Sequence, residues 1–100
     1  MGGSIYLGDR TIDGIAVTVD GEALDPRFDI MTFSELGFEW TYEGAEPQQL
    51  ALALLAHHLA DDARALRLSE SFMRNIVANF DNTWELSGPD IDAALAALDT

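Results

Sequence analysis

The sequence predicts an α+β fold: a small antiparallel sheet of three to four strands, packed against three to four helices that form a single layer on one face. Three observations lead to this class. Alternating segments and a hairpin turn signal occupy residues 4–43, helical periodicity occupies residues 47–98, and the chain has 100 residues of which 48% are hydrophobic. We expect a single domain over residues 1–100, with residues 1–3 disordered.

Two short strands and a turn are predicted near the start of the chain. Residues 4–8 and 15–19 alternate between the two faces of a strand. Asp20–Gly21 follows at once and is a strong hairpin signal, because glycine tolerates the positive φ of a type I′ turn. Residues 22–24 should return as the partner strand, which Pro26 ends because it has no N–H to donate.

The next segments predict a loop over residues 26–37 and a further strand over residues 38–43. In this strand the aromatic residues Phe38, Trp40 and Tyr42 alternate with polar ones, so we expect them on the core face rather than on a ligand-stacking platform. Its other face should then be wet and acidic.

The second half predicts helices. Residues 48–60 carry leucines on more than one side, so this helix should be central, with Pro47 in its first turn. Asp61–Asp62 can cap a helix reaching about Leu68, and Ser69 can cap another over residues 70–80.

A last short strand and a last helix complete the predicted fold. Residues 84–86 suit the strand, and Ser87 with Asp90 forms a capping signal for the helix that follows. The large side chains that we expect to be buried together are Trp40, Tyr42, Leu54, Phe72, Ile76, Leu95 and Leu98.

The charge balance excludes several classes of partner. Eighteen acidic and five basic residues give a net charge of −13, and all five basic residues are arginines. Such a surface repels phosphate, so we expect no direct nucleic-acid binding and no binding to anionic membranes. No basic segment precedes an apolar stretch at the start, and the longest apolar run is too short to span a bilayer. These features favour a cytoplasmic protein and leave a homo-oligomer open.

No motif predicts an enzyme, a metal site or a cofactor. The chain has no cysteine, and without lysine a P-loop is impossible. His57 and His58 stand four residues before Asp61 and Asp62, but zinc needs three or four convergent ligands, so we interpret the group as a helix end. Arg64, Arg67 and Arg74 are expected in surface ion pairs. We therefore predict no catalytic residue, no metal ligand and no cofactor.

The acids of the first half form the predicted partner-binding surface. Several other acids stand at predicted helix starts, where the helix dipole explains them. Residues 1–50 carry ten acids and two arginines, net −8, against −5 for the remainder. The acids on predicted strands and loops lack a capping role, and we assign partner binding to Asp20, Glu22, Asp25, Asp29, Glu35, Glu39 and Glu43.

Four segments give the chain a recognisable outline. They are Tyr6–Arg10 (Y-x-G-x-R), Gly37–Gly44 (G-F-x-W-x-Y-x-G), Pro47–Leu55 (P-x-Q-L-A-L-A-L-L) and Trp84–Leu86 (W-x-L). With them the chain resembles a family of small uncharacterised proteins found in bacteria, archaea, phages and other mobile elements. The likeness runs from about residue 5 to residue 98. It implies no catalytic residues, and it makes a phage or mobile-element setting plausible.

Two functions remain open from the sequence. The acidity fits a non-enzymatic protein that binds a basic, nucleic-acid-handling partner in competition with nucleic acid, as a phage-borne inhibitor of the anti-CRISPR or anti-restriction type would. It also fits a small cytoplasmic protein of a halophilic or GC-rich organism, in which carboxylates serve solubility only.

Overall fold

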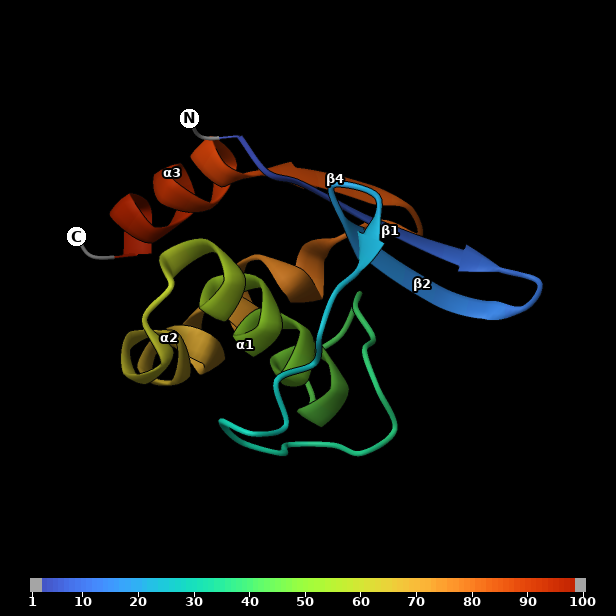
Figure 1. Cartoon of the computed structure of the whole chain (residues 1–100), viewed down its shortest axis with the longest axis horizontal. Coiled ribbons are helices and arrows are strands. Elements are labelled where there is room, and N and C mark those ends of the chain that lie inside the picture. Colours follow the sequence, from blue (N-terminus) through green and yellow to red (C-terminus); the bar gives the residue numbers. More distant parts are fainter. Residues whose placement is uncertain (1–2, 99–100) are drawn as a thin grey trace.

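The computed structural model describes residues 3–98, and in this range it shows a four-stranded antiparallel sheet and three α-helices (Figure 1). The α+β prediction is confirmed. Met1 and Gly2, for which we expected disorder, lie outside the described residues, and Gly3 is exposed and belongs to no helix or strand.

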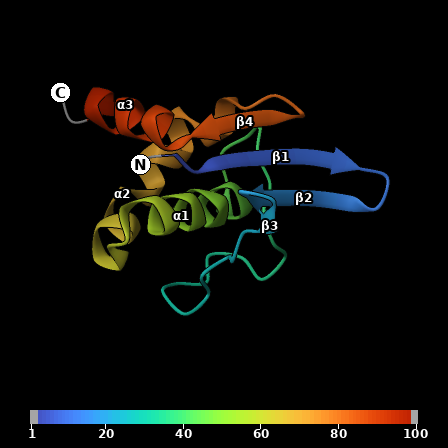
Figure 2. The same ribbon diagram turned by 45° about the horizontal axis from the view of Figure 1, so that its top comes forward.

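The sheet has the strand order β3-β2-β1-β4, and each strand is antiparallel to its neighbours (Figure 2). The helices gather where β1 begins, and the β1–β2 hairpin projects away from them in both views. In chain order the elements are β1 (Ile5–Thr11), β2 (Gly14–Val19), β3 (Glu22–Ala23), α1 (Ala45–Leu59), α2 (Asp62–Asn75), the 3₁₀ turn η1 (Val77–Asn79), β4 (Trp84–Ser87) and α3 (Gly88–Leu98).

The predicted hairpin between residues 15–19 and 22–24 is confirmed. Val19 pairs with Glu22 across the turn, and Asp20 and Gly21 adopt φ values of 52° and 89°. Both values are positive, as a type I′ turn requires. The turn thereby fixes the position of Asp20 at the end of β2, where its backbone N–H donates to the Ile5 carbonyl at 2.9 Å.

One hydrophobic core joins the sheet to the helices. The sheet face that carries Tyr6, Val17 and Val19 packs against α1, whose residues 50–55 are fully buried, as expected for a central helix. Of the predicted core residues, Trp40, Leu54, Phe72 and Leu95 are buried, and Ile76 and Leu98 are partly buried. Tyr42 was expected in this core, and that expectation is wrong, since it is 43% exposed.

The predicted strand over residues 38–43 is wrong; the segment is an irregular loop. Its backbone groups bind elsewhere: the Arg10 guanidinium donates to the Trp40 carbonyl at 3.0 Å, and the Thr41 N–H donates to the Val77 carbonyl at 3.3 Å. Thr41 also has a φ of 80°, which no strand accommodates. Trp40 still enters the core, but Tyr42 turns outward.

The helix boundaries also need one correction. Asp61 caps α2, as predicted, because its carboxylate accepts the Arg64 N–H at 3.1 Å. We expected Ser69 to cap a separate helix, but it lies within continuous α2, is 1% exposed and donates to the Leu66 carbonyl at 2.9 Å. The hydroxyl is satisfied inside the helix, and therefore no break is needed there.

The chain end follows the prediction closely. Trp84–Ser87 is the last strand and pairs with β1. Ser87 and Asp90 exchange hydrogen bonds as a capping box, with the Ser87 N–H donating to Asp90 at 2.9 Å and the Asp90 N–H donating to Ser87 Oγ at 3.1 Å.

Candidate functional site

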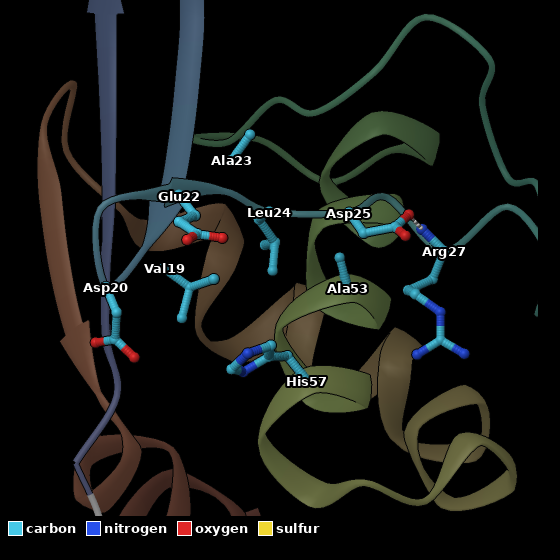
Figure 3. Close-up of a pocket in the computed structure, with 9 residues that line it drawn as sticks. All are labelled: Val19, Asp20, Glu22, Ala23, Leu24, Asp25, Arg27, Ala53 and His57. Atoms are coloured by element: carbon cyan, nitrogen blue, oxygen red, sulfur yellow. Dashed lines mark hydrogen bonds between the residues drawn. The ribbon is translucent and has the colours of Figure 1, made fainter.

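A pocket of about 410 Å³ opens between the β2–β3 turn and α1 (Figure 3). Its apolar lining comes from Val19, Leu24 and Ala53, which are 8%, 6% and 0% exposed, and from Ala23. Four further residues line it with polar or charged groups: Asp20, Glu22, Asp25 and His57, joined by Arg27 at one side. We call this the turn pocket.

Three of the seven acids predicted to bind a partner meet in the turn pocket. Asp20 accepts the backbone N–H of Ile5 at 2.9 Å, and Asp25 accepts the backbone N–H of Arg27 at 2.8 Å. Glu22 is exposed and makes no side-chain hydrogen bond within residues 3–98. None of the three forms an ion pair with a described residue. Their negative charge is therefore available to a ligand.

Arg27 does not neutralise these acids, although it lines the same pocket. Its guanidinium binds Asp29 and Asp62, each at 3.0 Å, and holds the pKa of the Asp29 carboxyl below its usual range through the hydrogen bond and its charge. Figure 3 shows Asp20 and Glu22 on one side of the pocket and Arg27 on the other. The side formed by the turn thus keeps its negative charge.

His57 lines the turn pocket and is held by Tyr6, which lies outside the pocket lining. The Tyr6 hydroxyl lies 2.7 Å from His57 Nδ1, and the two rings meet edge to face. Burial raises the pKa of the Tyr6 phenol to about 12, a hydrogen bond with Ser4 opposes this, and the charge of Asp20 adds to the rise. Tyr6 therefore stays neutral and holds the imidazole in place.

The other four predicted acids lie elsewhere. Asp29 is paired with Arg27, Glu39 with Arg10 at 2.7 Å, and Glu43 with Arg74 at 3.6 Å. Glu35 is exposed in the loop before Gly37. Because residues 38–43 form no strand, Glu39 and Glu43 do not share the acidic sheet face that we expected, and three of these four carboxylates are tied to arginines.

The histidine pair at the end of α1 is divided between two partners. His57 contacts Tyr6, while His58 Nε2 lies 2.6 Å from a carboxylate oxygen of Asp92 on α3. Asp61 caps α2 instead of facing His57. Within residues 3–98 no group of three or more histidines and acids is placed to hold a metal ion.

Gln49 is the structural residue that the sequence reasoning missed. Its side chain is fully buried, donates to the carbonyls of Pro26 and Met31 at 2.8 and 3.0 Å, and accepts the N–H of Phe33 at 2.7 Å. It thereby organises the loop that follows the turn pocket. The available signal was a polar residue inside a helix that is otherwise apolar on all sides.

Among the helices within residues 3–98, none has the length and apolar character needed to cross a membrane.

Neither the curated proteins nor the solved structures contain a match to the chain. A protein-family model does match, and it covers residues 6–97, from β1 to the last turn of α3. Its description reads "Family of unknown function (DUF6166)". Since the match covers nearly the whole chain, the protein belongs to this family.

Proposed function

We propose that this protein is a non-enzymatic, cytoplasmic interaction protein that binds a basic, nucleic-acid-handling partner through the turn pocket and competes there with nucleic acid. An inhibitor carried by a phage or another mobile element, of the anti-CRISPR or anti-restriction type, would act in this way. The proposal narrows the partner-binding set from seven acids to Asp20, Glu22 and Asp25.

One observation carries the proposal: three carboxylates without a cationic partner among the described residues line a pocket together with the apolar side chains of Val19, Leu24 and Ala53. An arginine or lysine side chain has the matching chemistry, because its methylene stem packs on apolar surface while its charged head binds carboxylates. Val19, Leu24 and Ala53 would contact the stem. Asp20 and Glu22 would bind the head.

The competition has a simple electrostatic basis. Double-stranded DNA carries about one negative charge per 1.7 Å of helix axis, and a protein with a net charge of −13 presents an alternative anion to the same basic groove. Long-range attraction should make association fast, and added salt should weaken it steeply.

Glu22→Lys tests the proposal most directly, because Glu22 is exposed and makes no internal contact that the substitution would break. Affinity purification from the host first identifies the partner. We then expect Glu22→Lys to lower affinity at least about tenfold and to restore DNA binding by the partner, since it replaces an attraction by a repulsion. The melting temperature should stay unchanged.

Glu85→Lys is the matched control. Glu85 is also an exposed strand residue, on β4, and the substitution changes the net charge by the same two units. It should retain the affinity of the parent apart from the small effect of net charge. Equal binding by both variants would contradict the proposal and favour the alternative in which acidity serves solubility only.

A further inference from the structure

The β1–β2 hairpin has an unpaired backbone edge. β3 is two residues long and pairs only with Thr18 and Val19, so within residues 3–98 no strand lies beside the Gly14–Ala16 half of β2 (Figures 1 and 2). On its other side this half pairs with Asp9–Thr11 of β1. Open edges of this kind are templates for pairing with another chain.

The backbone groups of Ile15 point to this edge. Val17 uses its carbonyl to accept the Leu24 N–H at 3.0 Å, on the side away from β1. Ile15 lies two residues earlier in the same strand, and backbone groups two residues apart point to the same side. The N–H and C=O of Ile15 are therefore directed outward, ready for an added strand.

An apolar groove runs beside the same edge. Its volume is about 720 Å³, and its lining combines Gly14 and Ile15 of β2 with Leu36, Phe38 and Tyr42 of the loop before α1. Leu36 is 86% exposed. A strand added to the edge would direct alternate side chains toward the groove, since successive side chains in a strand point to opposite faces.

The charge of the groove selects a basic occupant. Its two carboxylates are Glu39, which Arg10 neutralises, and Glu46, which accepts hydrogen bonds from the hydroxyls of Tyr42 and Ser34, both at 2.8 Å. Those hydroxyls lower the pKa of Glu46, and so does a backbone hydrogen bond in the first turn of α1. Glu46 therefore stays ionised, and within residues 3–98 no arginine pairs with it. A second copy of this chain would add another −13 charges, so repulsion disfavours self-pairing.

We propose that the Gly14–Ala16 edge of β2 binds an extended segment of a protein partner as an added β-strand, with an apolar side chain of that segment in the groove and a basic one at Glu46. The proposal relies on the proposed function only for the positive charge of the segment. Main-chain hydrogen bonds to Ile15 would supply affinity, and the groove would supply selectivity.

The probe for this site is a capped heptapeptide of alternating lysine and valine. On the uniformly labelled full chain, we expect its addition to shift the amide resonances of residues 14–16 and to slow hydrogen exchange of the Ile15 amide at least about tenfold. The matched control is the same peptide with N-methyl groups on alternate backbone nitrogens. It keeps every side chain and charge, and should not protect Ile15.

Two variants separate strand addition from charge attraction. Leu36→Asp adds negative charge to the groove, so attraction alone predicts tighter binding of the basic peptide, whereas loss of the apolar contact predicts binding weaker by about tenfold. Leu7→Asp adds the same charge at a partly exposed leucine of β1 outside the groove and should not weaken binding. Melting curves confirm that both variants are folded.

Three results would overturn the proposal: equal binding of the N-methylated peptide, tighter binding to Leu36→Asp, or a dimer in sedimentation that Leu36→Asp dissociates. Glu22→Lys distinguishes this site from the turn pocket. Unchanged peptide affinity in that variant supports the groove, and lost affinity places the peptide at the turn. If the peptide does not bind at the groove, the proposed function is still tested separately, by the effect of Glu22→Lys on affinity for the partner.

Discussion

Single residues hold the projecting hairpin against the loop that follows it. The Arg10 guanidinium donates to Asn82 at 2.6 Å and to Glu39 at 2.7 Å, and it lies 4.8 Å above the Trp40 ring. Trp40 in turn meets the Trp84 ring edge to face. One side chain of β1 thereby connects the sheet to residues that the sequence places far away.

Gly8 illustrates how little space these contacts leave. A Cβ at this position would lie 2.2 Å from two atoms of the Trp84 indole, a buried ring that also stacks on Phe80. We predict that Gly8→Ala lowers the free energy of unfolding by about 1–3 kcal/mol or more through overpacking. Urea denaturation measures this, with Gly3→Ala as the control, because a Cβ there meets nothing.

Tyr6 makes stability depend on pH in the alkaline range. Because burial raises its pKa to about 12, Tyr6 stays neutral in the folded protein at a pH where an unfolded chain, with a tyrosine pKa of about 10, already ionises. The contribution is therefore complete below about pH 10 and is lost as the pH rises through about 12. Tyr6→Phe should make urea stability less sensitive to pH in this window.

Ultraviolet titration checks the same residue directly. In a Tyr42→Phe variant Tyr6 is the remaining tyrosine, and its tyrosinate absorbance should rise with a midpoint near 12. A midpoint near 10 while the protein is still folded would show that the hydroxyl is solvated and that burial is not the cause.

At the scale of elements, local signals were predictable and long-range ones were not. Asp20–Gly21, the Ser87–Asp90 capping box and the apolar α1 each depend on neighbours in sequence, and all three are confirmed. The alternation over residues 38–43 also suggested an element, but Arg10, whose contact depends on the tertiary fold, binds the backbone there.

The candidate site was predictable only in part, for the same reason. The hairpin signal placed Asp20 and Glu22 together at one turn. Nothing local indicated that Glu39 and Glu43 would be tied to Arg10 and Arg74, residues that approach only in the folded chain.

The capping box of α3 gives a prediction for an element. Hydrogen bonds from the backbone and side chain of Ser87 lower the pKa of Asp90, so the carboxylate stabilises the folded state above the unfolded pKa of about 3.9. This contribution is lost as the pH falls through the lower folded pKa. Asp90→Ala should lower the melting temperature at neutral pH, and the difference from the parent should shrink in acid. A constant difference would exclude the ionised cap as its source.

The whole molecule carries far more negative charge than its arginines neutralise. The ion pairs formed by Arg10, Arg27 and Arg74 are partly exposed. Exposed pairs contribute about 0–1 kcal/mol each to stability, so the fold loses little stability when salt screens them. The remaining repulsion among the acids is longer in range. Salt should therefore stabilise the fold overall.

A salt series on the parent protein provides the test that separates the two explanations of the acidity. The Debye length falls from about 10 Å at 0.1 M salt to about 3 Å at 1 M, which removes repulsion across the surface. We expect the protein, with its single buried core, to be folded at 0.1 M and to melt at a higher temperature at 1 M. Glu22→Lys and Glu85→Lys each replace one negative by one positive charge, taking the net charge from −13 to −11, and both should show a smaller increase. A chain that is unfolded near 0.1 M and folds only in molar salt would instead support the halophilic alternative, because its acids would then be explained without a partner.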